Sequence, residues 1–350
     1  MELREIKLEP ILDTLKLTKI TDEVYFSEQY SSYVSNSRLG LINPNQGGSP
    51  EKFFAGFVKG GFSPALELGS AVHELTLQPE YFELAEDCGK PTAKLGAMAD
   101  ALYPIFVGRK VEAEDVIEAS NTVDYYKGKM TNDLIKKVIE SCTPYWENRS
   151  KSELNIELAK ERIYLDAKTM EITNACVEVL RNNEQVQKLL HPTGVLETPI
   201  IANEQAILMD VKAICPNGKE TILHLKSKLD NYTIDLEEGV ITVNDVKTLG
   251  KILPEFDGNI EKYRYSREMA MYLYLLKLCA TKFYNLNNPK IRANYLVVST
   301  IPDFYSKVQA VTYGEIVKGF HEFQTLLRYV AYQICYHNYV LDKPVGKYQL

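Results

Sequence analysis

The chain has 350 residues, 45% of them hydrophobic, and can therefore bury the core of one large domain or of two modest ones. Its 40 basic and 47 acidic residues give a formal net charge of −7, which argues against a protein that holds nucleic acid mainly by overall electrostatic attraction. No apolar run approaches the length of a membrane span, and residues 1–10 carry charges where a signal peptide would be apolar, so we expect a cytoplasmic protein with no membrane partner.

The cysteines of the chain are widely scattered and include no C-x-x-C pair. Their spacing suits neither a zinc site nor an iron–sulfur cluster, so we expect reduced and mostly structural thiols. The six are Cys88, Cys142, Cys176, Cys215, Cys279 and Cys335.

The N-terminal half is expected to be largely helical. After a mixed start, the Pro, Gly and Asn residues of 43–50 predict a loop. Residues 63–78 predict a helix, because Ser63 can cap it, Pro64 suits its first turn and apolar residues recur at helical spacing. Charged helical patterns then dominate residues 105–190.

The pattern changes after residue 194 to short β-rich runs separated by turn signals. A long helix at about 261–281 and a final helix at about 313–337 interrupt and follow these strands. We therefore expect an α/β fold with a central mixed sheet of about five strands flanked by helices. Residues 1–190 would add helices to a core at 191–350, in one compact domain. The predicted strands lie within 196–202, 206–216, 221–232, 240–248, 292–301 and 305–313.

One strand, within "VITVNDVKT" at 240–248, carries an acid and a lysine on the same face. Asp245 and Lys247 are two residues apart, and side chains two apart on a strand point the same way. A hairpin would bring Asp230 of the preceding strand alongside Asp245. Two converging carboxylates need a cation, and hard oxygen ligands suit Mg²⁺ or Mn²⁺, as one ion or two. Such a site fits phosphodiester hydrolysis, with the lysine orienting or activating the nucleophile.

Two structural readings compete with this hypothesis. An acid and a lysine two apart on a strand are commonly a solvated, salt-bridged face. The tripeptide also occurs a second time, in "MDVKA" at 209–213, as Asp210 and Lys212. We favour the copy at 245–247, because Asp230 precedes it across a hairpin.

These residues resemble the PD-(D/E)xK nuclease superfamily, and within it the phage-type RecE and lambda exonucleases and their RecB-like relatives. The family pattern of an Asp at a strand end, a hairpin and then (D/E)-x-K is similar to "KLD" at 228–230 followed by "NDVKT" at 244–248. The resemblance implies three catalytic residues and three metal-site positions on these strands. The catalytic residues are Asp230, Asp245 and Lys247, and the metal-site positions are Asp230, Asp245 and Val246.

Two further residues follow from the same resemblance. The stretch "LGSAVHELTLQPEYF" at 68–82 looks like the upstream helix that carries a histidine in this family, which implies His73 as a metal ligand; the alternative is a histidine packed in the core. The stretch 196–210 is similar to the first strand of the lambda-type core, which implies Glu197 as an auxiliary catalytic acid; the alternative is a solvated acid.

The family also carries Gln-x-x-x-Tyr on the helix after the lysine strand. Here Glu268 stands where Gln is expected and Tyr272 is in register, although Tyr272 could equally belong to the core. Lys262, Arg264 and Arg267 near the start of that helix form a basic cluster. The resemblance implies that Glu268 and Tyr272 face the DNA. The place of the basic cluster beside the proposed metal suits contacts with the phosphate backbone, whereas the alternative for the cluster is a solvated helix face.

The resemblance implies a Mg²⁺- or Mn²⁺-dependent deoxyribonuclease, most simply a 5′ to 3′ exonuclease of phage-type recombination that acts on double-stranded DNA ends. A single-strand annealing protein would be its partner, and a ring-shaped trimer or tetramer would place basic residues along a DNA channel. A phage-encoded chain would act in the cytoplasm of its bacterial host. A RecB-like endonuclease and a catalytically decayed DNA-binding or assembly protein are the alternatives.

Overall fold

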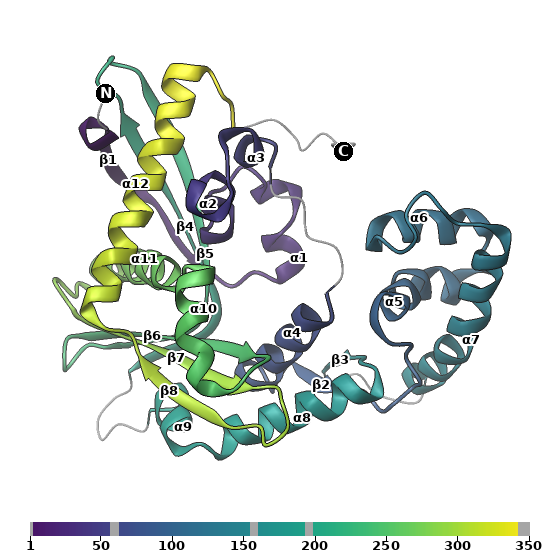
Figure 1. Ribbon diagram of the computed structural model, residues 1–350. Helices are drawn as coiled ribbons and strands as arrows, with labels where there is room; N and C mark the ends of the chain where they lie inside the picture. Colours follow the sequence, from purple (N-terminus) through teal and green to yellow (C-terminus); the bar gives the residue numbers. More distant parts are fainter. Residues whose placement is uncertain (1–2, 57–62, 155–159, 193–198, 342–350) are drawn as a thin grey trace.

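The computed structural model describes residues 3–56, 63–154, 160–192 and 199–341. At its centre is a six-stranded sheet in the order β1-β4-β5-β6-β7-β8 (Figure 1). Strands β6 and β7 pair in parallel, and the other neighbours pair antiparallel, so the predicted mixed α/β sheet is confirmed. The strands are β1 (Lys7–Thr18), β4 (Ile200–Ile214), β5 (Glu220–Asp235), β6 (Val240–Leu249), β7 (Lys290–Ser299) and β8 (Ser306–Ala310).

The sheet differs from the predicted one in two details. The sheet has six strands rather than about five, because β1 forms in the segment read as mixed. Strand β1 lies at the sheet edge, contains Pro10 and leaves much of its length exposed, so it lacks the apolar alternation of an inner strand. The runs predicted at 196–202 and 206–216 join into β4, in which Glu204 has a φ of 51°.

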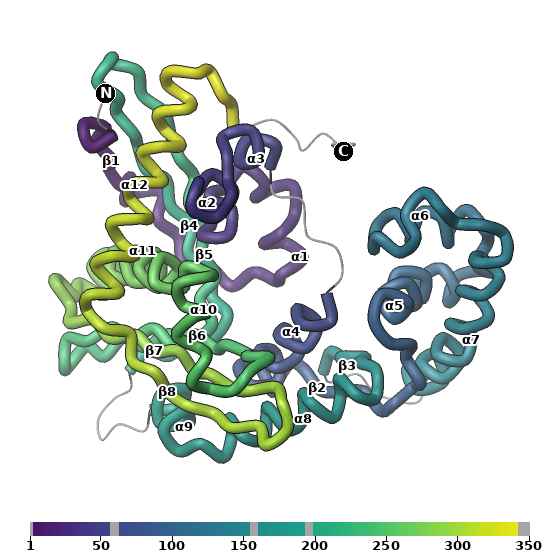
Figure 2. The backbone as a smooth tube through the Cα atoms, viewed as in Figure 1, coloured from purple at the N-terminus to yellow at the C-terminus, as the bar shows by residue number. Residues whose placement is uncertain are grey.

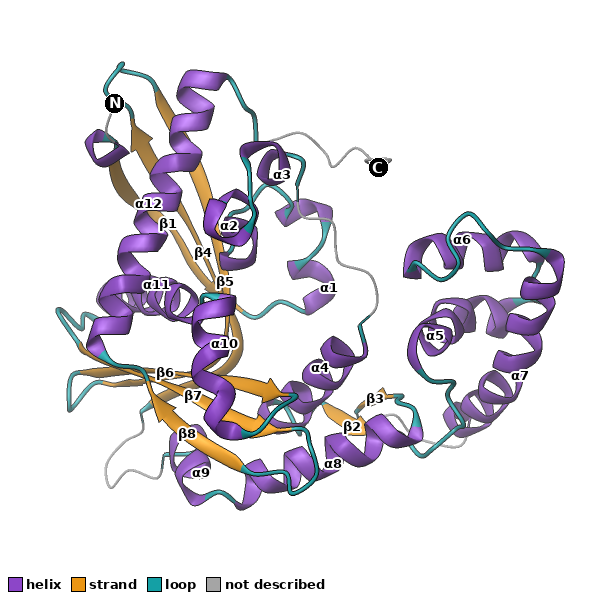
Figure 3. Cartoon of the chain, viewed as in Figure 1, coloured by secondary structure: helices purple, strands orange, loops and turns teal. Residues whose placement is uncertain are grey.

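Helices cover both faces of the sheet (Figure 3). One face packs against α11 (Tyr265–Tyr284) and α12 (Tyr313–His337), with which inner-strand residues form the largest apolar core. The other face packs against α4 (Pro64–Leu77), α8 (Ala167–Asn182) and α9 (Glu184–Leu190). The inner strands β5 and β6 therefore contact one helix of each layer, α4 and α11, and these helices frame the site.

The predicted helices at 63–78 and 313–337 are confirmed as α4 and α12, whereas the helix expected at 261–281 is broken. It consists of α10 (Phe256–Tyr263) and α11, separated at Arg264, whose φ of 58° is left-handed and ends α10. Helix α12 crosses the start of α11 at Gly319, where a Cβ atom would lie 2.0 Å from the Ser266 carbonyl oxygen. Only glycine permits this approach.

Three helices, α5 (Ala93–Gly108), α6 (Ala113–Val123) and α7 (Asn132–Leu154), form a separate lobe (Figure 2). They have a core of their own around Trp146, which is 1% exposed and donates to the Ala99 carbonyl at 2.8 Å. The single compact domain expected from the sequence stays a prediction. No described helix combines the length and the apolar character that a bilayer crossing requires.

The remaining elements are short. Strands β2 (Phe82–Leu84) and β3 (Glu161–Ile163) form a parallel pair beside α4. The short helices are α1 (Asp22–Tyr25), α2 (Asn36–Ile42) and α3 (Pro50–Phe54), and the 3₁₀ turns are η1 (Leu3–Glu5), η2 (Glu28–Tyr30), η3 (Pro44–Gln46) and η4 (Leu253–Glu255).

Candidate active site

Three carboxylates lie in one row across neighbouring strands β4, β5 and β6. The pairs Asn203↔Asn231 and Gln205↔Leu229 flank Glu204 and Asp230, so these two acids face each other across the β4–β5 ladder. The β5–β6 ladder ends at Asn231↔Asn244, which places Asp230 and Asp245 in the next register position. Residues opposite each other in an antiparallel pair share a face. The row of Glu204, Asp230 and Asp245, which we call the acid row, therefore projects to one side of the sheet.

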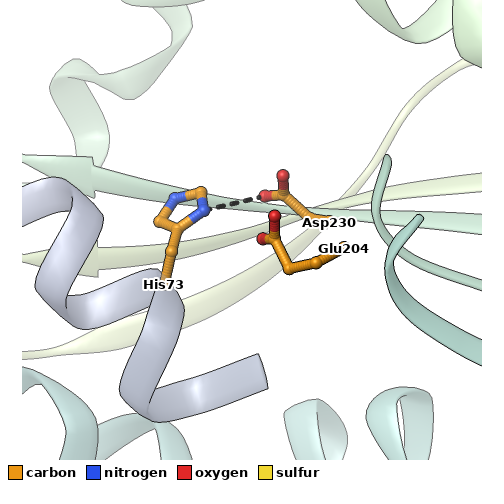
Figure 4. A group of neighbouring side chains, drawn as sticks. All are labelled: His73, Glu204 and Asp230. Carbon is orange, nitrogen blue, oxygen red and sulfur yellow. Dashed lines mark ion pairs between the residues drawn. The ribbon is translucent and has the colours of Figure 1, made fainter. Parts of the chain in front are cut away.

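Helix α4 brings His73 to this row. The Nδ1 atom of His73 lies 3.3 Å from Oδ2 of Asp230, and Figure 4 shows the imidazole and the carboxylates of Asp230 and Glu204 converging. One ligand atom from each of these three residues lies within 4.8 Å of the other two. Asp245 does not belong to this group among the described residues. One imidazole nitrogen and two carboxylates form a donor set that fits Mn²⁺ and accommodates Mg²⁺.

The protonation behaviour of this group also favours a cation. Burial, followed by the charge of Glu204, raises the pKa of Asp230, although Lys247 and the Val246 amide, which donates to Asp230 Oδ2 at 2.8 Å, act in the opposite direction. Burial lowers the pKa of His73, with Glu204 partly offsetting the effect. The raised pKa of Asp230 reflects unfavourable buried negative charge, which a divalent ion would relieve on displacing the proton, and the neutral imidazole is the form of His73 that binds a metal.

Lys247 is held by two acids on the β6 and α11 sides of the site. Its Nζ atom lies 2.7 Å from Asp245 Oδ2 and 3.1 Å from Glu268 Oε2. Burial alone would lower the pKa of Lys247, but Asp245 and Glu268 outweigh it and keep the pKa well above the ordinary value, so the side chain is an ammonium ion. Burial also raises the pKa of Asp245, whose side chain is 2% exposed. The ammonium ion thus lies at the edge of the proposed cation site.

The site opens into a cleft of about 930 Å³. Among its described lining residues are seven carboxylates and four lysines, so without a bound cation the cleft would repel a polyanion. A divalent ion at His73, Glu204 and Asp230 would remove much of that repulsion. The lining carboxylates are Asp22, Glu23, Glu74, Glu161, Glu204, Asp230 and Glu268, and the lysines are Lys19, Lys226, Lys228 and Lys247.

The second copy of the Asp-Val-Lys tripeptide has other partners. Asp210 Oδ1 lies 2.7 Å from His224 Nδ1, and Lys212 Nζ lies 2.7 Å from Glu220 Oε2. Among the described lining residues of the cleft, neither Asp210 nor Lys212 occurs. This copy forms a local hydrogen bond and a local ion pair on the β4–β5 hairpin.

Glu204 was not predicted from the sequence, and the predicted auxiliary acid, Glu197, lies outside the described residues. A signal for Glu204 exists in the hairpin turn at 215–218. Glu204 precedes Asn217 by thirteen residues and Asp230 follows it by thirteen, so a hairpin centred on Asn217 places the two acids opposite each other.

The residues expected to contact DNA differ in their exposure and in their partners. Lys262 is exposed on α10, whereas Arg264 caps that helix and lies 3.8 Å from Glu322. Tyr272 is 8% exposed, and its hydroxyl donates to Glu268 Oε1 at 3.3 Å. Glu268 therefore holds Lys247 and Tyr272 together, and its position beside the ammonium ion gives the carboxylate a defined structural role.

Arg267 is buried, with 1% exposure, so its guanidinium group does not reach solvent where a DNA phosphate could bind. It donates to Asn36 Oδ1 at 2.7 Å and to Gln46 Oε1 at 2.9 Å, and it lies 3.4 Å from Glu322 Oε1. Arg267 thereby ties α2, η3 and α12 to α11.

Replacing Arg267 by alanine is expected to destabilise the fold by on the order of 3 kcal/mol, because the substitution removes a buried guanidinium group and leaves the partly buried carboxylate of Glu322 and two amides without their donor. Urea unfolding followed by circular dichroism measures this loss. Lys262→Ala is the matched control, since Lys262 is exposed on the preceding helix, and it should change the free energy of unfolding by less than about 0.5 kcal/mol. Equal effects of the two substitutions would contradict the role assigned to Arg267.

Lys226 lies on β5 four residues before Asp230 and is buried, with 7% exposure. Its Nζ atom donates to the Tyr25 carbonyl at 2.7 Å and lies 4.4 Å from the centre of the Tyr25 ring. No carboxylate among the described residues forms an ion pair with it. Burial, with a contribution from Arg38, lowers the pKa of Lys226 to about 8.

This lowered pKa predicts a pH-dependent effect of Lys226→Met. The folded state holds the proton of Lys226 less tightly than the unfolded chain does. The buried ammonium ion therefore destabilises the fold fully below about pH 8, and this destabilisation decreases as the pH rises towards 10.5. We expect the variant to exceed the wild type in stability at pH 6 by on the order of 2 kcal/mol and the gap to shrink by pH 9.5. Urea unfolding at both pH values measures this difference in the free energy of unfolding. A difference that widens with pH would contradict the lowered pKa of Lys226.

Comparisons with known proteins add little to this geometry. No family model matches the chain, and no curated protein matches it in sequence. A crystal structure of a "Putative exonuclease" from Eubacterium rectale is similar over 94% of this chain and 97% of that chain, with 14% sequence identity and a TM-score of 0.45. A likeness this distant carries no argument about function, which rests on the residues described above.

Proposed function

We propose that the protein is a divalent-metal-dependent nuclease that hydrolyses phosphodiester bonds of DNA. The observation that carries this proposal is the convergence of His73, Glu204 and Asp230 within 4.8 Å of one another, in a cleft that Lys247 also lines. A cation site next to a fixed ammonium ion suits phosphodiester hydrolysis, because both groups can stabilise the negative charge that develops on the phosphate. The order of these residues along the chain also resembles the PD-(D/E)xK nucleases.

Each side chain has a role in this proposal. A bound Mg²⁺ or Mn²⁺ would supply Lewis-acid stabilisation of negative charge on the phosphate. His73, Glu204 and Asp230 would hold the ion, and the Val246 amide fixes the carboxylate of Asp230. Lys247 would orient the attacking water and stabilise charge that develops on the phosphate, while Asp245 and Glu268 keep its ammonium group in place. Asp245 would join the ligand set if its carboxylate turned from Lys247 towards Asp230.

The finer proposals concern the substrate and the assembly. We propose linear duplex DNA ends as the substrate, degraded from the 5′ end. Assembly into a ring and pairing with a single-strand annealing protein stay predictions, which mass measurement in solution and co-purification would test.

In the test, the protein is incubated with end-labelled linear duplex DNA and with closed circular duplex DNA, in the presence of Mg²⁺, of Mn²⁺ or of a chelator. The proposal predicts loss of label from linear DNA in either metal and none in chelator. Nicking of the circles would indicate the RecB-like endonuclease instead. Absence of cleavage in both metals would contradict the proposal and favour a DNA-binding protein whose nuclease site has decayed.

A further inference from the structure

Four asparagines form a hydrogen-bonded row across strands β4, β5, β6 and β7, which we call the asparagine row. The amide of Asn294 donates to Asn244 at 2.9 Å, Asn244 donates to Asn231 at 2.7 Å, and Asn231 donates to Asn203 at 2.7 Å. The pairs Asn203↔Asn231, Asn231↔Asn244 and Asn244↔Asn294 are all in register, so the row runs straight across the sheet.

The asparagine row lies directly beside the acid row. Asn203 precedes Glu204, Asn231 follows Asp230, and Asn244 precedes Asp245 in the sequence. Because successive side chains on a strand alternate between faces, the amides project from the face opposite the carboxylates. Each of these amides therefore holds the stretch of backbone that also positions the neighbouring acid.

The row reaches the helix that carries His73. Asn203 Nδ2 donates at 2.7 Å to the carbonyl of Leu77, the last residue of α4, and His73 lies one turn earlier on that helix. On the same face, Asn244 Nδ2 also lies 3.3 Å from the Leu189 carbonyl of α9. One chain of hydrogen bonds therefore links the elements that carry His73, Glu204, Asp230 and Asp245.

Because two of these amides are buried, their hydrogen bonds help to fix the register between β5 and β6. Asn231 and Asn244 are both 0% exposed, and a buried amide without a partner is strongly unfavourable. A slip of one residue between β5 and β6 would leave these amides unpaired and would send the neighbouring acids to the other face of the sheet. Apolar side chains at these positions would fill the space but would not discriminate between registers in this way.

We propose that Asn203, Asn231, Asn244 and Asn294 are positioning residues, which fix the spacing of the carboxylates on the opposite face of the sheet from one another and from His73 of α4. The inference rests on the proposed function, since it concerns the same cation site. It assigns to the asparagine row a contribution to Mn²⁺ affinity as well as to folding. Hydrogen bonds that orient metal ligands from outside the ligand set typically change metal affinity by roughly 10- to 100-fold.

The experiment measures Mn²⁺ binding to the metal-free protein by calorimetric titration, together with its melting temperature. The double variant Asn231→Leu/Asn244→Leu removes both buried partners at once, a change that leaves few orphaned polar groups and is expected to keep the fold. Asn203→Ala, at the partly exposed end of the row, is a second variant that cuts the bond to α4. We expect the Mn²⁺ dissociation constant to rise about 10-fold or more in both variants.

Thr233→Val is the matched control. Thr233 lies on the same strand and the same face as Asn231, two pairs further from the acids, opposite Thr242. Its Mn²⁺ affinity should equal that of the wild type, whatever happens to its melting temperature. Wild-type affinity in both asparagine variants would overturn the positioning role while leaving the proposed nuclease intact. A wild-type protein that binds no Mn²⁺ would overturn the proposed function, and the positioning role with it.

Discussion

Asp230→Asn is expected to abolish metal-dependent DNA hydrolysis and to weaken Mn²⁺ binding by more than roughly 100-fold, the upper range for residues that act on a metal only indirectly. Asp230 is the centre of the acid row, with His73 at 3.3 Å and Glu204 opposite it on β4. The amide keeps the shape and the acceptor for the Val246 N–H but removes the charge. Cleavage of end-labelled duplex and calorimetric Mn²⁺ titration measure the two effects.

Asp210→Asn is the matched control for this substitution. Asp210 is also a carboxylate on the β4–β5 hairpin, and its side chain forms a local hydrogen bond of 2.7 Å with a histidine. We expect wild-type cleavage and wild-type Mn²⁺ affinity from this control. Retention of both properties in Asp230→Asn would remove Asp230 from the site.

Lys247→Met is expected to lower the rate of DNA hydrolysis by roughly 10²- to 10³-fold, which is typical for removal of one group that stabilises transition-state charge. Mn²⁺ binding should be retained, because Lys247 is not a ligand and its loss removes a neighbouring positive charge. The substitution removes the ammonium ion that lowers the pKa of the buried Asp245, so this carboxyl group binds its proton more tightly in the folded state. The variant should therefore lose stability as the pH rises, and its fold must be verified by circular dichroism at the pH of the assay.

The chain supplies a matched control in Lys212→Met. Lys212 occupies the corresponding place in the other Asp-Val-Lys tripeptide and pairs with Glu220. Its replacement should leave the rate of DNA hydrolysis unchanged. Equal losses of activity in the two lysine variants would show that neither tripeptide is specific to the reaction.

Local sequence pattern was sufficient to predict the hairpin that carries Asp230, Asp245 and Lys247. The period-2 alternation of β5 and β6 and the turn between them determine which side chains share a face. The helical spacing around His73 likewise predicted α4. Register on one hairpin is a local property, and for that reason a single sequence reveals it.

Features that depend on packing between distant segments could not be predicted from the sequence in this way. Arg267 reads as part of a basic cluster, yet its acceptors come from Asn36, Gln46 and Glu322, up to 231 residues away in the sequence. Strand β1 has the exposure of an edge and forms by pairing with β4. Arg264 breaks a predicted helix through a left-handed conformation that its residue type does not favour.

The asparagine row is an intermediate case. Each of Asn203, Asn231 and Asn244 adjoins an acid of the site, and this pattern is visible in the sequence. Its structural role is evident only from the register of the three ladders, which brings the amides side by side.

An anomalous difference map from crystals soaked in Mn²⁺ tests the central claim most directly. The account predicts a peak at roughly 2 Å from His73, from Glu204 and from Asp230 together. A peak that is coordinated elsewhere, or a cleft with no peak at a Mn²⁺ concentration that supports DNA cleavage, would contradict it.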